Sequence, residues 1–245
     1  MTIAHRPEHV VWHDVECSRY DADMDLWREL AAAAQGPILD VGAGTGRVTR
    51  DLARRRHDVV ALDIDPTLLA ELERRARAEG LRVQTVVADA SDFALQRRDF
   101  ALVMAPMQTV QLLRPAGRLG FLRCARVHVA PGGLVAIALV DALETFDKEH
   151  VLLPLPDELV IDGTLYSSQP VALRDHGDTV TIERIRQIVT ASGRRSACDD
   201  ILHLDRVAIE QVEAEGRAAG LQVLPRRNIG QTEEHVGTSV VMLRG

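Results

Sequence analysis

Between residues 38 and 140 the chain alternates short apolar runs with segments whose apolar residues recur at helical spacing. Short runs that are apolar throughout are typical of strands buried on both faces, and the helical segments predict their covering layers. The expected strands cover residues 38–41, 58–63, 81–89, 100–105 and 134–140, and the expected helices cover 45–56, 66–81 and 119–129. This order predicts five βα units and a parallel, doubly wound α/β sheet.

The pattern changes from about residue 159 to 204, where apolar and polar residues alternate with period two. Turn signals at residues 176–178 and 192–193 predict antiparallel strands, inserted as a β meander. A helix over 205–219 follows, and two last strands over 222–225 and 239–243 could pair as a hairpin. We therefore expect an N-terminal lid or helical segment (1–37), a ligand-binding core (38–150), inserted antiparallel strands (151–204), and a C-terminal helix with the last two strands of the core sheet (205–245).

Composition narrows the class of protein only slightly. The 29 basic and 36 acidic residues give a net charge of −7, which argues against a nucleic-acid backbone as the main partner. The longest apolar stretch, residues 133–140, is too short to cross a bilayer, and the N-terminus lacks the apolar run of a signal peptide. Cys17, Cys124 and Cys198 are far apart and odd in number, so we expect neither disulfides nor a zinc site. These features favour a cytoplasmic enzyme without metal.

The segment ILDVGAGTGR, residues 38–47, carries the most specific signal. An apolar strand containing Asp40 opens into three alternating glycines, Gly42, Gly44 and Gly46, ahead of a helix. Glycines allow a tight turn and close approach of a ligand to the helix start. A dinucleotide loop needs a further glycine where this chain has Arg47, and the ending of a Walker A loop is also absent. A nucleotide-type ligand other than NAD or ATP is therefore indicated.

This GxGxG loop resembles the first motif of class I S-adenosylmethionine-dependent methyltransferases. Three further features match at compatible spacings: Asp63 after the second strand, Asp89 with Ala90 after the third, and the turn PGG at residues 131–133. The resemblance implies a seven-stranded, mostly parallel sheet whose last strand returns antiparallel between its neighbours. It also implies that Asp63 binds the ribose hydroxyls, that Asp89 and Ala90 receive the adenine, and that the carbonyl of Ala105 receives the cofactor's amino group. The cofactor-binding residues expected in this way are Tyr20, Gly42, Ala43, Gly44, Thr45, Gly46, Asp63, Ile64, Asp89, Ala90 and Ala105.

Two segments beside these motifs leave alternatives open. In small-molecule members of the family an N-terminal segment with a tyrosine, here Tyr20, covers the cofactor; the alternative is a helix anchored on the sheet by aromatic residues such as Trp27. After the fourth strand the chain reads APMQ at 105–108, without the polar-Pro-Pro-aromatic tetrapeptide of amino-group methyltransferases that modify nucleic acids and certain proteins. Gln108 and Gln111 could bind an acceptor or simply lie on a helix surface.

Together these motifs predict a methyltransferase (EC 2.1.1.-) that uses S-adenosyl-L-methionine on a small molecule by in-line methyl transfer. Alignment of the reactants supplies most of the rate, so no catalytic residue is required, although His13, Glu16 or His203 could act as a base. The alternatives are a protein that binds S-adenosylmethionine or S-adenosylhomocysteine without turnover, and a nicotinamide-dependent oxidoreductase. We expect a monomer or homodimer with a small-molecule methyl acceptor as partner, no nucleic acid and no membrane. The inserted strands could form a lid or an oligomer interface.

Overall fold

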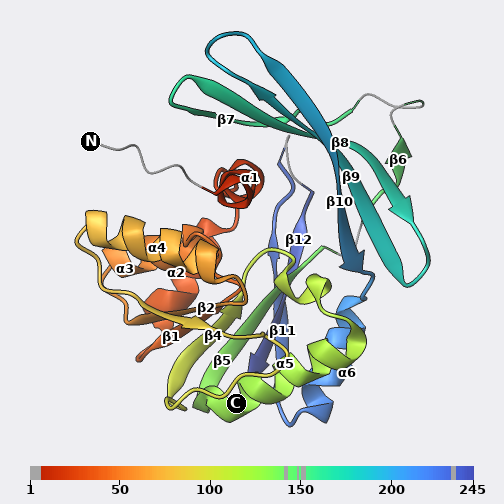
Figure 1. The fold of residues 1–245 in the computed structure, drawn as a ribbon. Helices are drawn as coiled ribbons and strands as arrows, with labels where there is room; N and C mark the ends of the chain where they lie inside the picture. The colour runs from red at the N-terminus through yellow and green to blue at the C-terminus, as the bar shows by residue number, and fades with distance from the viewer. Residues whose placement is uncertain (1–6, 141–142, 148, 150–152, 233–235) are drawn as a thin grey trace. The chain divides into compact units, whose positions relative to one another are not determined.

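The computed structural model of the chain describes residues 7–140, 143–147, 149, 153–232 and 236–245 (Figure 1). Its contacts divide the chain into a core unit, Asp21–Ala142 with Asp205–Gly245, and an antiparallel unit, Met1–Tyr20 with Leu143–Leu204. The boundary expected between residues 150 and 151 lies outside the described residues. The N-terminal segment expected over 1–37 is shared between the two units.

The core unit is built on a seven-stranded sheet of order β11-β12-β5-β4-β1-β2-β3. Its strands are β1 (Ile38–Val41), β2 (Val59–Asp63), β3 (Gln84–Val87), β4 (Phe100–Ala105), β5 (Val129–Leu139), β11 (Gln222–Ile229) and β12 (Thr238–Arg244). Its helices are α2 (Met24–Ala33), α3 (Arg47–Arg54), α4 (Pro66–Ala78), the 3-10 helix η1 (Thr109–Leu112), α5 (Pro115–His128) and α6 (Ile209–Ala218). Strands β1 to β5 run parallel, and β12 lies antiparallel between β5 and β11. The expected seven-stranded, mostly parallel sheet is confirmed.

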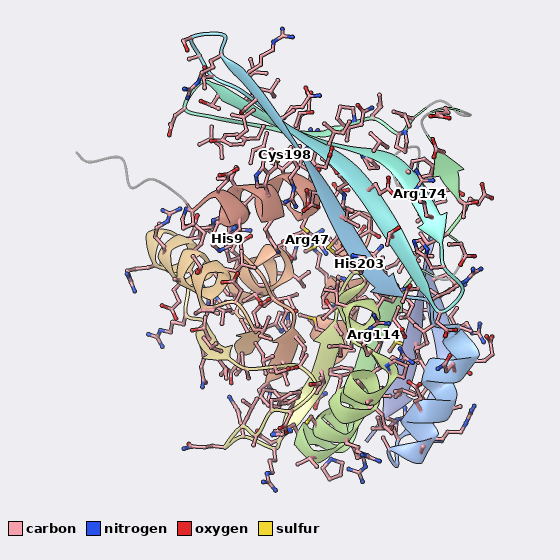
Figure 2. All side chains as sticks on the ribbon, turned by 45° about the vertical axis from the view of Figure 1, so that its right-hand side comes forward. His9, Arg47, Arg114, Arg174, Cys198 and His203 are labelled. Atoms are coloured by element: carbon pink, nitrogen blue, oxygen red, sulfur yellow. The ribbon has the colours of Figure 1, made fainter. Side chains whose placement is uncertain are left out.

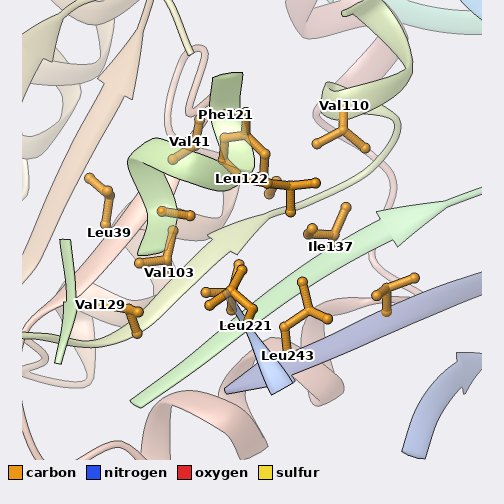
Figure 3. Packing of buried hydrophobic residues seen from close by; sticks show 14 of the residues in the cluster. Leu39, Val41, Val103, Val110, Phe121, Leu122, Val129, Ile137, Leu221 and Leu243 are labelled. Carbon is orange, nitrogen blue, oxygen red and sulfur yellow. The ribbon is translucent and has the colours of Figure 1, made fainter. Parts of the chain in front are cut away.

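Apolar side chains bury both faces of this sheet. On one face Phe121 and Leu122 of α5 pack against Val41, Val103 and Ile137 of the sheet (Figure 3). Helices α2, α3 and α4 cover the other face. Because each fully buried side chain of this size contributes about 1.5–3 kcal/mol, this packing stabilises the sheet that carries the loops.

The antiparallel unit contains a five-stranded sheet with β10, β9, β8 and β6 in order and β7 paired to β8. Its elements are α1 (Glu8–Cys17), β6 (Phe146–Asp147), β7 (Asp157–Ile161), β8 (Thr164–Asp175), β9 (Thr179–Val189) and β10 (Arg195–Asp205). Helix α1 packs on this sheet through Val11, Trp12 and Val15, and the Trp12 ring meets Tyr166 edge-on at 5.6 Å. The expected inserted meander is confirmed as a separate antiparallel sheet.

Three local expectations need correction. The PGG turn lies inside β5 rather than before it, because the amide of Gly132 and the carbonyl of Gly133 pair with Gly245 and extend the strand pairing. No helix follows β3 in the described residues 88–99, and β5 is followed by the antiparallel strands, so three rather than five strands of the parallel series lead into helices. The long run over 158–175 is divided by Asp162 and Gly163, whose positive φ values of 48° and 75° form a tight hairpin between β7 and β8.

The chain passes between the two units three times, and each passage is fixed on the core side by a buried polar side chain. The pairs are Arg47 with Asp23, Gln111 with the backbone of Val140, and Arg118 with Asp205. A buried polar group that loses its partner lowers the stability of the fold. These pairs therefore attach the chain to the core unit at Asp23, Val140 and Asp205. In the described part of the chain, no helix has both the length and the apolar character needed to cross a membrane.

Candidate functional site

The glycine loop joins β1 to α3 at the carboxyl end of the sheet. Gly42, Gly44 and Gly46 all have left-handed φ values, of 74°, 54° and 86°. The amides of Gly42 and Ala43 both donate to the carbonyl of Leu62 in β2, at 2.8 and 3.1 Å. Glycine is required here because other residues rarely adopt this backbone region.

Close neighbours add a second reason for two of these glycines. A Cβ on Gly42 would lie 2.5 Å from Cγ2 of Thr109 in η1, and a Cβ on Gly46 would lie 1.9 Å from Cδ1 of Leu72 in α4. The loop therefore packs closely against η1, which follows β4, and against α4, which follows β2. Thr45, within the loop, is buried.

Asp63 ends β2 and contacts the glycine loop directly. Its Oδ2 accepts a hydrogen bond from the amide of Gly44 at 2.7 Å, and its Oδ1 accepts from the amide of Asp65 at 2.9 Å. A carboxylate has about four acceptor positions, so further donors such as a pair of hydroxyls can still bind. The next residue, Ile64, leaves 66% of its surface exposed, which is unusual for isoleucine and provides an apolar surface beside Asp63. Asp65 itself caps α4, accepting from the amides of Thr67 and Leu68, as its position before Pro66 predicts.

Asp89 follows β3, the neighbour of β2 at the sheet edge. Its carboxylate is exposed and accepts a hydrogen bond from the amide of Ser91 at 2.7 Å. This backbone bond, with a second from the Ser91 side chain, holds the pKa of Asp89 below its ordinary value. Asp89 therefore stays ionised as an acceptor, and the half-buried Ala90 follows it in the same turn.

Asp40 lies in the middle of β1, beneath the loop, and is 1% exposed. Its Oδ2 accepts from the hydroxyl of Thr49 in α3 at 2.6 Å, whereas its Oδ1 is buried with no hydrogen-bond partner among the described residues. Burial raises the pKa of Asp40 to about 6, against the opposing hydrogen bond of Thr49 and the charge of Arg47. A buried oxygen without a hydrogen-bond partner can accept a bond from a cationic group of a ligand. Asp40 was not among the cofactor-binding residues expected from the sequence.

The segment after β4 carries the expected residue Ala105 and two glutamines. Ala105 is fully buried at the end of β4, and Met107 two residues later has a positive φ of 55°. Gln111 donates from Nε2 to the carbonyl of Val140 at 3.0 Å and accepts from its amide at 2.9 Å. Gln111 is therefore a buried side chain that binds the backbone of Val140, not a surface amide. The sequence also missed Thr109, whose proximity to Gly42 no local pattern indicates.

The remaining candidates belong to the antiparallel unit. Tyr20 is half-buried there, and its contact with a cofactor stays a prediction. Glu16 accepts from Nε of Arg186 and the hydroxyl of Ser168, both at 2.8 Å. Burial raises its pKa, but Arg186 and the charge of Arg184 outweigh this and leave the value below normal, so Glu16 is a poor base. His203, labelled in Figure 2, is exposed.

A separate cavity of about 490 Å³ opens in the core unit between β2, β3 and the loop before β4. It is lined by Val60, Val86, Leu95, Phe100 and neighbouring residues, and by none of the expected cofactor contacts. Among the described residues, no group of three or more His, Cys, Asp or Glu side chains is arranged to hold a metal ion. The carboxyl end of β1 to β4 is therefore the better candidate site, because ligands of such sheets bind there.

Part of the chain that contains these residues matches a known protein family. Residues 38–133 match a family model described as a methyltransferase domain. A ubiquinone biosynthesis O-methyltransferase of Rhizobium etli is 28% identical over 149 residues, which cover 58% of each chain. A magnesium-protoporphyrin O-methyltransferase of Rhodobacter capsulatus is 44% identical over 69 residues, covering 27% of this chain and 30% of that one. The chain thus spans well under two thirds of the length of these curated relatives.

Solved structures are similar over nearly the whole chain. A S-adenosylmethionine-dependent methyltransferase of Clostridium acetobutylicum has a TM-score of 0.73 at 16% identity, covering 96% of both chains. The sugar N-methyltransferase KedS8 of a Streptoalloteichus species has a TM-score of 0.72 at 20% identity, covering 99% of this chain and 95% of its own. CalS10 of Micromonospora echinaspora, an amino pentose methyltransferase solved with S-adenosylmethionine, has a TM-score of 0.70 at 22% identity, covering 96% and 97%. At these identities the likeness shows the fold, including both sheets.

Proposed function

We propose that this chain, whose residues 38–133 match a methyltransferase domain, is a class I methyltransferase that transfers the methyl group of S-adenosylmethionine to a small molecule. The observation that carries the proposal is the direct hydrogen bond between Gly44 of the glycine loop and Asp63 at the end of β2. It brings the two most specific motifs of the sequence together at the carboxyl edge of adjacent parallel strands. Asp89, after the next strand, adds a further acceptor at the same edge.

The residues present fit the chemical groups of S-adenosylmethionine. The carboxylate of Asp63 suits the ribose hydroxyls, Ile64 offers an apolar surface to the adenine, and Asp89 suits the adenine amino group. The unpartnered Oδ1 of Asp40 suits the ammonium of the methionine part, and the narrow loop at Gly42 lets backbone approach it. Tyr20, Thr45, Ala90 and the Ala105 carbonyl complete the proposed contacts.

Bound S-adenosylmethionine supplies an electrophilic methyl group on its sulfonium sulfur. The part played by this chain is to hold an acceptor in line with that methyl group and to exclude water. Alignment of two reactants can account for about 7–11 kcal/mol of barrier lowering, so the proposal needs no dedicated base. The ion pairing of Glu16 agrees with this, since it removes one of the three candidate bases.

A small-molecule acceptor is favoured over nucleic acid by the net charge of −7, which repels a phosphate backbone. Structures of similar fold include a sugar N-methyltransferase and an amino pentose methyltransferase. Amino sugars are therefore the first acceptor class to examine. The chain's departure from the polar-Pro-Pro-aromatic tetrapeptide, at residues 105–108, agrees with an acceptor other than a nucleobase.

The test is a screen for S-adenosylhomocysteine release with amino sugars, other small amines, phenols, carboxylates and thiols. We expect release with at least one class, and its loss in Asp63→Asn. A control is Asp65→Ala, which removes a helix cap next to the site without removing a proposed cofactor contact. Cofactor binding without release for any acceptor class would favour the non-catalytic binding protein instead.

A further inference from the structure

Arg47 stands where helix electrostatics disfavour it. It is the first residue of α3, and the N-terminus of a helix carries a partial positive charge that repels cations. Its place directly after Gly46 is also where a dinucleotide loop has glycine. A cation at this position therefore needs a compensating partner.

That partner is Asp23, which lies just before α2. Nη1 of Arg47 donates to Oδ1 of Asp23 at 2.5 Å and Nη2 donates to Oδ2 at 2.7 Å, so both carboxylate oxygens are bound by one guanidinium. Asp23 is 1% exposed and the Arg47 side chain 12% exposed. Two parallel charge-assisted bonds fix both distance and orientation, which a single ion pair does not. Arg47 is labelled in Figure 2.

The side chain of Asp23 binds Arg47 and does not cap helix α2. It occupies the N-cap of α2, where aspartate usually accepts from the helix amides, yet its side chain makes no capping bond. Instead its Oδ2 also accepts from Nε1 of Trp27, at 2.7 Å. Trp27 is fully buried and packs in the same cluster as Val48 and Leu52 of α3. The pair thus belongs to a buried cluster that joins the beginning of α2 to the beginning of α3.

Arg47 also influences Asp40, the buried residue beneath the glycine loop. Its charge favours the ionised form of Asp40, whose buried Oδ1 lies beneath the glycines without a partner. Through Asp23 it holds the chain three residues after Tyr20, the N-terminal residue expected to contact the cofactor. One guanidinium therefore binds Asp23 and directly follows the glycine loop in the chain.

We propose that Arg47 is a positioning residue that, through its bidentate pair with Asp23, holds the glycine loop and the segment leading from Tyr20 in the arrangement that binds S-adenosylmethionine. This inference rests on the proposed function. It assigns Arg47 no contact with the reacting atoms. Its loss should lower affinity for the cofactor more than it lowers stability.

The chain offers a matched control on the same two helices. Arg28 of α2 pairs with Asp51 of α3 through two bonds of 3.0 and 2.9 Å, remote from the start of α3. The variants to compare are Arg47→Gln, Arg47→Lys, Asp23→Asn and Arg28→Gln. For each, three quantities are measured: thermal unfolding without ligand, hydrogen exchange of the peptide containing residues 42–46, and the Kd for S-adenosylmethionine by calorimetry.

For Arg47→Gln and Asp23→Asn we expect faster exchange in the loop and a Kd raised about tenfold or more, the effect of losing a charge-assisted pair. Arg28→Gln should leave both within about twofold, because this partly exposed pair lies away from the glycine loop. Arg47→Lys keeps the charge but cannot span both oxygens, so it should fall between wild type and Arg47→Gln. In turnover assays, Arg47→Lys should raise the KM for S-adenosylmethionine and leave kcat nearly unchanged.

Equal loop exchange and equal Kd in the Arg47 and Arg28 variants, at matched loss of thermal stability, would overturn the inference. If Arg47→Gln does not fold, Arg47→Lys against Arg28→Gln decides the same question. Loop exchange is measured without ligand. A wild-type protein that binds no S-adenosylmethionine would therefore refute the proposed function, while unchanged exchange in the Arg47 variants would separately refute the role of Arg47.

Discussion

Replacing Asp40 with asparagine should make the ligand-free protein more stable at neutral pH while weakening its binding of S-adenosylmethionine. Asp40 is fully buried, and burial raises its pKa from the ordinary 3.8 to about 6. A carboxyl group with a raised native pKa binds its proton more tightly when folded than when unfolded. The native state therefore gains stability as the pH falls through 6 toward 4, and lacks that gain at pH 7.

The magnitude follows from the two pKa values. Their difference, from 3.8 to about 6, corresponds to about 3 kcal/mol across the whole titration, of which about 1.4 kcal/mol appears between pH 7 and pH 5. The asparagine of Asp40→Asn would keep an oxygen for the hydroxyl of Thr49 but place an amide where Oδ1 has no partner, so the gain at pH 7 should be below about 3 kcal/mol.

Urea unfolding of wild type and Asp40→Asn at pH 5 and pH 7 isolates this contribution, because all other carboxyl groups are shared. We expect wild type to gain about 1.4 kcal/mol relative to the variant on going from pH 7 to pH 5. Calorimetry at pH 7 should show weaker binding of S-adenosylmethionine by the variant. Parallel pH dependences of the two proteins would contradict this prediction, because Asp40 would then titrate alike in the folded and unfolded states.

Three further substitutions test other parts of the account. Asp63→Asn should weaken S-adenosylmethionine binding about 10- to 150-fold in calorimetry, the loss of about 1.5–3 kcal/mol for charge-assisted bonds; unchanged affinity would remove Asp63 from the site. Arg118→Met leaves the mostly buried carboxylates of Asp205 and Glu215 without their cation and should lower the free energy of unfolding in urea by about 3–5 kcal/mol. A loss below about 1 kcal/mol would mean that these two ion pairs contribute little to stability. Gly46→Ala should destabilise the protein more than Gly80→Ala, because both have positive φ but only the first places a Cβ against Leu72; equal melting temperatures would contradict this.

Local patterns predicted the core sheet well because its strands are buried on both faces. Residues 38–41 and 100–105 read as apolar runs in the sequence and are strands with the same bounds in the structure. The helix cap at Asp65 also has a local sequence signal, because an aspartate directly before a proline favours a helix start. The position of β12 between β5 and β11 came from the family resemblance and not from its apolar pattern.

The site was predicted less completely because several of its contacts join distant segments. The bond from Gly44 to Asp63 crosses 19 residues, and the Arg47 to Asp23 pair crosses 24. No spacing rule links an arginine at a helix start to an aspartate before another helix. The Asp162-Gly163 hairpin, in contrast, had a plain sequence signal, because this dipeptide favours two-residue turns.

We infer that this chain binds S-adenosylmethionine at the carboxyl edge of β1 to β3 and uses it as a methyl donor. Titration calorimetry of the full chain with S-adenosylmethionine, S-adenosylhomocysteine and NAD in parallel tests this inference. We expect saturable binding of the first two, weakened in Asp63→Asn, and no binding of NAD. Binding of NAD alone, or no binding of S-adenosylmethionine by the folded protein, would contradict it.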